Sequence, residues 1–261
     1  MNGQVCVVTG ATSGIGKAAA TALARLGAQV LLVGRDHGRA EAAAAQIGSV
    51  SALPPKVEIA DLASMAQVRS LATRLAALER IDVLINNAGL MPSERRITPD
   101  GFESAFAVNH LAPFLLTNLL LPKLAGPARV VTVASGAHTT ASLDLEDPNM
   151  EHGWESWRSY ANSKLANIMF TRELARRLGG TAVTANCMHP GLVRTRLSRD
   201  LRPVLRLGLA PVNDGGNAPV GAKLLCPSTA SQSAGKRVQW YRFHCLKLSN
   251  ERAAFSWCAR L

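Results

Sequence analysis

Two hydrophobic patterns alternate along this chain. Short runs rich in Val, Ile and Leu are typical of buried strands, and longer runs with apolar positions every three or four residues are typical of helices. The predicted strands lie near residues 4–9, 29–33, 56–60, 82–86, 128–135 and 181–188. The predicted helices lie near residues 15–26, 36–47, 64–79, 101–121 and 158–178. Because strand and helix follow each other repeatedly, we expect an α/β fold in which helices cover both faces of one doubly wound parallel sheet.

The first predicted strand-to-helix turn is rich in glycine, in the sequence Thr9-Gly10-Ala11-Thr12-Ser13-Gly14-Ile15-Gly16. Such glycines allow a tight turn, let the backbone approach a pyrophosphate and let the helix pack closely on the strand. The spacing differs from the commoner G-x-G-x-x-G, and a glycine-rich turn without a ligand is the alternative interpretation. The flanking strand and helix favour a nucleotide site of the Rossmann type. Its candidate cofactor-binding residues are Gly10, Ser13, Gly14, Ile15 and Gly16.

Tyr160 and Lys164 stand four residues apart within a predicted helix, so their side chains share one helix face. An ammonium group beside a phenol favours the ionised phenol, which would lower the pKa of Tyr160 from its usual value near ~10. Tyr160 is therefore a candidate proton donor. Taken alone, the pair is more typical of a surface tyrosine beside a snorkelling lysine, and the accompanying motifs decide between the two.

Several further motifs follow in a characteristic order. They are Asp61-Leu62 after a strand, Asn86-Asn87-Ala88-Gly89, Asn109 in Val108-Asn109-His110, Ser135 at the end of a strand, and Pro190-Gly191 with Thr195. Together with the glycine turn and the Tyr160 pair, they make the chain resemble the short-chain dehydrogenase/reductase family from its first residues to about Thr195. Five phrases are similar to the retinol-dehydrogenase-like branch: Asp100-Gly101-Phe102-Glu103, Val108-Asn109-His110-Leu111, Phe114-Leu115-Leu116-Thr117, Ser163-Lys164-Leu165-Ala166-Asn167 and His189-Pro190-Gly191.

The resemblance implies an oxidoreductase that interconverts an aldehyde or ketone, including retinoid-like and other lipophilic ones, and its alcohol by hydride transfer. Tyr160 would be the general acid/base, and Ser135 would hydrogen-bond the same substrate oxygen. Lys164 would lower the pKa of Tyr160 and bind the nicotinamide ribose, while Asn109 would hold a water linked to Lys164. The alternatives are a catalytically weak dinucleotide-binding regulator of the same fold and a basic interaction module.

The resemblance also implies the remaining cofactor contacts. They come from Asp61, Leu62, Asn87, Ala88, Gly89, Pro190, Gly191 and Thr195, besides Tyr160 and Lys164. Gly34 occupies the position where relatives that prefer NAD place an acidic residue, and Arg35 follows it. Because an arginine can form forked, charge-assisted bonds with a phosphate, we expect NADP(H) to be preferred over NAD(H). The alternative is that Arg35 pairs with Asp36 or with another surface carboxylate.

The 261 residues are expected to form one domain, because no linker rich in Pro, Gly and Ser divides them. Residues 1–195 would form the dinucleotide-binding and catalytic core, and residues 196–261 a substrate-loop region and a divergent carboxyl-terminal segment. Residues 194–261 hold 12 Lys and Arg against 3 Asp and Glu, so the formal net charge of +11 is concentrated there. No aromatic interleaving, helix-turn-helix or zinc pattern accompanies it, which favours a solvated basic face over nucleic-acid binding. Residues 221–261 contain few family motifs, which either a divergent lineage or an altered reading frame would explain.

The composition indicates where the protein is located and which partners it binds. The five cysteines show no metal-ligand spacing, and an odd number suits a reducing compartment. No uninterrupted apolar run of about 18 residues appears, and the first strand begins near Met1, so we expect no transmembrane anchor and a cytoplasmic location. No metal site is expected, although Asp144, Glu146 and Asp147 lie between Ser135 and Tyr160. The expected partner is a small-molecule carbonyl or alcohol substrate, and the sequence is compatible with a homo-oligomer.

Overall fold

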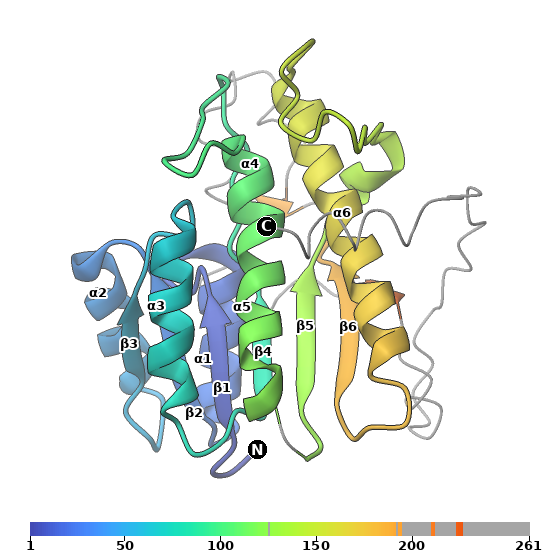
Figure 1. The fold of residues 1–261 in the computed structure, drawn as a ribbon. Coiled ribbons are helices and arrows are strands. Elements are labelled where there is room, and N and C mark those ends of the chain that lie inside the picture. Colours follow the sequence, from blue (N-terminus) through green and yellow to red (C-terminus); the bar gives the residue numbers. More distant parts are fainter. Residues whose placement is uncertain (125, 192, 195–209, 212–222, 227–261) are drawn as a thin grey trace.

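The computed structural model describes residues 1–124, 126–191, 193–194, 210–211 and 223–226. Its main feature is a seven-stranded sheet, with the strand labels shown in Figure 1. The strands are β1 (Val5–Thr9), β2 (Gln29–Gly34), β3 (Lys56–Ile59), β4 (Val83–Asn86), β5 (Arg129–Val133), β6 (Thr184–His189) and β9 (Lys223–Cys226). A separate pair joins β7 (Val193–Arg194) to β8 (Ala210–Pro211) in parallel.

The order of the strands is β3-β2-β1-β4-β5-β6-β9. The first six run parallel, and β9 runs antiparallel to β6. The order reverses at β1, which has β2 on one side and β4 on the other. In open α/β sheets the ligand crevice lies outside the carboxyl ends of the strands at this reversal. The topology confirms the predicted Rossmann-type fold and places the glycine turn, which follows β1, at that crevice.

Helices cover both faces of the sheet (Figure 1). They are α1 (Gly14–Arg25), α2 (His37–Gly48), α3 (Met65–Ala76), α4 (Ser104–Phe106), α5 (Ala112–Leu120) and α6 (Ser156–Arg177). Because successive strand residues point to opposite faces, Val7 belongs to the core with α3, α5 and α6, whereas Cys6 and Val8 belong to the core with α1 and α2. The central strands are therefore apolar on both sides, as buried parallel strands are.

The helix predicted over residues 101–121 is interrupted. After α4 the backbone widens into a π-helical turn, η1 (Ala107–Leu111), before α5 begins, and a 3-10 turn, η2 (Leu121–Lys123), ends the segment. Pro113 has no N–H group to donate to the carbonyl of Asn109 four residues earlier, so an undistorted α-helix cannot form there. The sequence pattern correctly predicted a helical segment but not its local geometry.

Within the described residues, one helical segment, Ser104–Lys123, is long and apolar enough by length and composition to span a membrane. The expectation from uninterrupted apolar runs missed it, because polar residues such as Asn109 and Thr117 break the run without removing its apolar character. In the structure, 72% of that apolar stretch is buried, and α5 packs on α3 and on the sheet. Core packing accounts for its composition.

The predicted strand over residues 128–135 is shorter than expected, since β5 ends at Val133. Ser135 instead caps the 3-10 turn η3 (Gly136–Thr140), because its Oγ accepts a hydrogen bond from the N–H of Ala137 at 3.2 Å. Thr195 and most of residues 196–261, including the expected basic segment, lie outside the described residues.

Candidate active site at the carboxyl edge of the sheet

The turn between β1 and α1 requires glycine at several positions. Gly10 has a φ of +67° and Gly14 a φ of +56°, in the left-handed region that other residues rarely adopt. A Cβ on Gly10 would lie 2.8 Å from the Cα of Ala88, and a Cβ on Gly16 would overlap the carbonyl of Gly10. Ser13 is the N-cap of α1, but its side chain makes no capping hydrogen bond. The first N–H groups of α1 therefore remain for an anion, and the turn fits the diphosphate of a dinucleotide.

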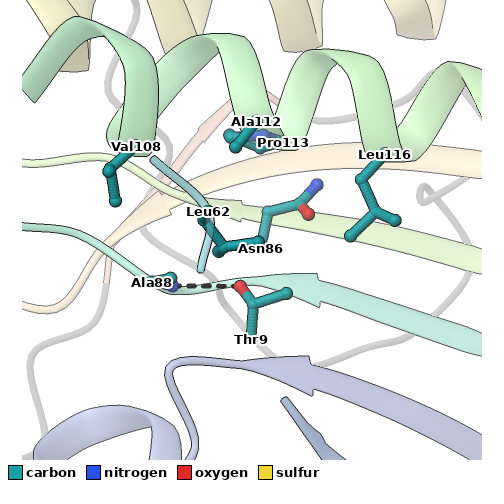
Figure 2. Close-up of a pocket in the computed structure, with 8 residues that line it drawn as sticks. All are labelled: Thr9, Leu62, Asn86, Ala88, Val108, Ala112, Pro113 and Leu116. Carbon is teal, nitrogen blue, oxygen red and sulfur yellow. Dashed lines mark hydrogen bonds between the residues drawn. The ribbon is translucent and has the colours of Figure 1, made fainter. Parts of the chain in front are cut away.

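The segment after β4 is fastened to this turn. Thr9 Oγ1 accepts hydrogen bonds from the N–H groups of Asn87 and Ala88, each at 3.0 Å, the second of which is drawn in Figure 2. The Nδ2 of Asn87 donates to the carbonyl of Thr9 at 2.9 Å. These bonds hold residues 87–89 beside the glycine turn, so two of the predicted cofactor motifs form one surface.

A narrow apolar gap lies between the π-turn and the ends of β1 and β4. Figure 2 shows its lining residues, which are Thr9, Leu62, Asn86, Ala88, Val108, Ala112, Pro113 and Leu116. The gap has no room for a water molecule. Asn86, one of the lining residues, donates from its Nδ2 to Thr117 Oγ1 at 2.9 Å. This region packs the helix on the sheet, and Leu62 takes part in that packing.

Arg35 follows β2, is exposed and makes no hydrogen bond or ion pair with the described residues. Asp36 is instead the N-cap of α2, and its carboxylate accepts from the N–H of Arg39 at 2.8 Å. The alternative in which Arg35 pairs with Asp36 is therefore not what the structure contains. Arg39, in the first turn of α2, has a buried Nε without a hydrogen-bond partner in the described part of the chain. No sequence motif indicated this second guanidinium.

Asp61 lies just beyond β3, at the same edge of the sheet. One of its carboxylate oxygens accepts from the N–H of Ala63 at 3.0 Å, and its own N–H donates to Gln67 Oε1 at 2.8 Å. These bonds fix the loop between β3 and α3. The structure brings Asp61 to the predicted edge of the sheet, while its contact with an adenine amino group stays a prediction.

Tyr160 is buried near the start of α6, in a small apolar cluster with Met91, Ala137 and Ala161. Ser135 follows the end of β5 and lies close enough to the phenol to influence its pKa. Burial raises the pKa of Tyr160, and Ser135 opposes this more weakly. The structure thus brings the predicted catalytic tyrosine and serine near each other, and the phenol stays protonated at neutral pH.

Lys164 lies one turn along α6, as the spacing predicted. Its Nζ is 5.6 Å from the centroid of the Tyr160 ring and donates to the carbonyl of Val133 at 2.8 Å. Burial lowers the pKa of Lys164 to about 8, and Cys187 acts in the opposite direction. The expected lowering of the Tyr160 pKa by Lys164 is wrong for this structure, because burial of the phenol dominates and raises that pKa.

Asn109 occupies the middle of the π-turn and is buried. Its side chain accepts from the N–H of Leu90 at 2.8 Å and donates to the carbonyl of Leu90 and to Ser163 Oγ, each at 2.9 Å. A Cβ placed on Gly89 would lie 3.4 Å from both Asn109 Oδ1 and Lys164 Nζ. Asn109 and Lys164 therefore flank Gly89, and three separately predicted residues meet at one point.

Pro190 and Gly191 follow β6, whose neighbour in the sheet is β5. The N–H of Ala134 donates to the carbonyl of Met188 at 2.8 Å, which ties the end of β6 to the segment that carries Ser135. Gly191 has a φ of +79°, so the chain turns sharply there. Both residues lie at the predicted edge, and Thr195 lies outside the described residues. No cluster of His, Cys, Asp and Glu suited to a metal occurs in the described part of the chain.

Comparison with known proteins agrees with this geometry. A family model described as short chain dehydrogenase matches residues 4–205. Retinol dehydrogenase 14 of Mus musculus is 46% identical over 217 residues, which are 77% of this chain and 64% of that protein. Retinol dehydrogenase 13 of Homo sapiens is 45% identical over 202 residues, covering 76% of this chain and 61% of that protein. The chain thus spans about two thirds of the length of these curated relatives.

Solved structures show the same fold. A putative uncharacterized protein from Mycobacterium paratuberculosis is 41% identical, with a TM-score of 0.67 over 81% of this chain and 78% of that one. A putative short chain dehydrogenase from Shigella flexneri, complexed with NADP, is 28% identical, with a TM-score of 0.66 over 81% of this chain and 87% of that one. From the family match, the relatives and the fold together, the chain belongs to the short-chain dehydrogenase family, on its retinol-dehydrogenase-like branch.

Proposed function

We propose that this protein is an NADP(H)-dependent oxidoreductase that interconverts an aldehyde or ketone and its alcohol. The observation that carries the proposal is the buried phenol of Tyr160, with Ser135 close enough to influence its pKa and Lys164 Nζ 5.6 Å from the centroid of the same ring. Two hydroxyl groups near each other suit a single developing oxyanion. The glycine turn lies at the same edge of the sheet and suits the diphosphate of the cofactor.

The chemistry divides between cofactor and protein. When bound, the nicotinamide supplies a hydride to the carbonyl carbon, or accepts one from the alcohol. Tyr160 donates its proton to the carbonyl oxygen during reduction, and its raised pKa keeps that proton in place at neutral pH. Ser135 hydrogen-bonds the same oxygen and holds it in line. Lys164 contributes its positive charge and the proposed contact with the ribose, and Asn109 the proposed link to solvent.

The preference for NADP(H) rests on two guanidinium groups near the end of β2. Arg35 is exposed and has no partner among the described residues, and the Nε of the neighbouring Arg39 is buried and also lacks one. Gly34 places no carboxylate at the position where relatives that prefer NAD have one. Among similar structures, the Shigella flexneri protein holds NADP and a Sphingobium yanoikuyae dehydrogenase holds NADPH. The names of the curated relatives extend the proposal to retinoid-like and other lipophilic substrates.

The decisive experiment compares the wild type with Tyr160→Phe, using NADPH and a panel of retinal, an aromatic aldehyde and a ketone. Turnover is followed by loss of the nicotinamide absorbance band. Tyr160→Phe should abolish nearly all turnover and leave the Kd for NADPH close to the wild-type value, because only the hydroxyl is removed. Lys164→Ala should weaken both. If Tyr160→Phe keeps the turnover of the wild type, the mechanism is refuted. If the wild type binds NADPH but turns over none of these substrates, the protein is a regulator instead.

A second experiment tests the cofactor preference. Arg35→Ala and Arg39→Ala should each weaken NADPH binding by roughly 10- to 150-fold, from about 1.5 to 3 kcal/mol per charged hydrogen bond, and leave NADH binding unchanged. Arg25→Ala is the matched control, since Arg25 is an exposed arginine in the last turn of α1. Equal affinity of the wild type for NADPH and NADH would contradict the assignment.

A further inference from the structure

The carbonyl of Asn109 has an unusual partner. In an α-helix the N–H four residues later would donate to it, but that residue is Pro113, which has none. The Nδ2 of Asn167 donates to this carbonyl instead, at 2.8 Å, from α6. Both asparagines are almost fully buried, with 1% and 2% of their surfaces exposed. A side chain 58 residues away in sequence therefore supplies the hydrogen bond that the helix cannot.

The orientation of the Asn167 amide is fixed from both ends. The Asn109 carbonyl can only accept, so Nδ2 must face it, and Oδ1 must then face His110, whose Nδ1 lies 3.2 Å away. His110 must carry a hydrogen on Nδ1, because two acceptors would otherwise oppose each other. Its ring lies near those of Phe106, Phe114 and Phe170, and this burial lowers the pKa of His110 to about 4, so the imidazole is neutral at neutral pH.

Asn167 also lies on the helix that carries the catalytic pair. It follows Lys164 by three residues, one helical turn, and Ser163, beside Lys164, accepts a hydrogen bond from the Asn109 side chain. The π-turn is thus joined to α6 by two buried hydrogen bonds, one to the Asn109 side chain and one to its carbonyl. A carbonyl oxygen has two lone pairs, and Asn167 occupies one of them.

We propose that Asn167 is a positioning residue for the reaction. Its amide, oriented by His110, holds the Asn109 carbonyl in the π-turn so that the second lone pair of that carbonyl accepts a hydrogen bond from the water that passes a proton back to Lys164. This inference rests on the proposed function, because Asn109 and Lys164 act in that reaction. Residues that fix a reacting group through a short chain of buried contacts affect rate more than binding, since small displacements at the reacting atoms cost much of the rate.

Asn167→Ala is the test, and Asn162→Ala is its matched control. Asn162 lies on the same helix and is buried, and its amide also makes two backbone hydrogen bonds, both to Ser142 in the loop before α6. Asn167→Leu, which keeps nearly the same volume, serves if the alanine variant folds poorly. For each variant one measures kcat against pH, the solvent deuterium isotope effect, the Kd for NADPH, and hydrogen exchange in the peptide covering residues 107–112.

In Asn167→Ala, kcat should fall by at least about 10-fold, its pH profile and isotope effect should change, and exchange in residues 107–112 should accelerate, with NADPH affinity retained. Asn162→Ala should lose stability yet keep the wild-type pH profile. If the wild type shows turnover that Tyr160→Phe abolishes, but Asn167→Ala and Asn162→Ala turn over equally, this inference alone is overturned. If the wild type shows no turnover that depends on Tyr160, the proposed function is overturned and this inference with it.

Discussion

The buried carboxylate of Glu103 offers a sharp test of how the site is supported. Only 1% of its surface is exposed, and no cation among the described residues pairs with it. Its Oε2 accepts from the N–H of Phe106 and from Ser159 Oγ, each at 2.9 Å, and Oε1 accepts from Ser104 Oγ at 3.3 Å. Glu103 is thus the N-cap of α4 and also holds α6 at the residue before Tyr160.

The cost of Glu103→Ala follows from these contacts. Loss of the cap costs about 1 kcal/mol, and the buried hydroxyl of Ser159 left without its acceptor costs about 1–3 kcal/mol. The free energy of unfolding should therefore fall by about 2–4 kcal/mol, which for a chain of this size lowers the Tm by roughly 5–15 °C. Glu103→Gln keeps an oxygen for Phe106 and can donate to Ser104, so it should lose less than about 1.5 kcal/mol.

Thermal and urea unfolding of the two variants, followed by circular dichroism, measures both effects. Glu94→Ala is the control, because Glu94 forms its ion pair with Arg96 on the surface, where such pairs contribute little. If Glu103→Ala were as stable as Glu94→Ala, or no less stable than Glu103→Gln, the carboxylate would not be the support that its contacts indicate.

Two further perturbations test other parts of the structure. Because burial lowers the pKa of His110 from 6.5 to about 4, the unfolded chain takes up this proton at a higher pH than the folded chain. The free energy of unfolding should therefore fall by on the order of 3 kcal/mol as the pH drops from 6.5 to 4. Urea unfolding at several pH values should show a smaller fall in His110→Gln, and an equal fall in the wild type and the variant would exclude this titration. Gly16→Ala should abolish NADPH binding and lower the Tm, because the added Cβ would overlap the Gly10 carbonyl. Gly48→Ala is the control, because its added Cβ meets only ordinary contacts, and it should change neither property. Fluorescence titration with NADPH and thermal unfolding measure the two effects.

The features that the sequence determined by itself are local ones. Val7 and its neighbours predict a buried strand from a few consecutive residues, and the glycines from Gly10 to Gly16 predict the following turn, because the left-handed backbone at Gly10 is rarely open to other residues. The pairing of Tyr160 with Lys164 likewise follows from the helical period alone. The order of strand and helix then limits the sheet to few topologies, and the structure has one of them.

Tertiary structure decided what depends on residues distant in sequence. No local pattern indicates that Asn167 bonds to the carbonyl of Asn109, although Pro113 in the sequence already denies that carbonyl its helical partner. The raised pKa of Tyr160 depends on burial of the phenol, which a four-residue spacing does not specify. Helical periodicity fixes which residues share a face, but only the packing of α6 against the π-turn and the sheet fixes which atoms on that face meet, and hydrogen bonding and desolvation depend on those atoms.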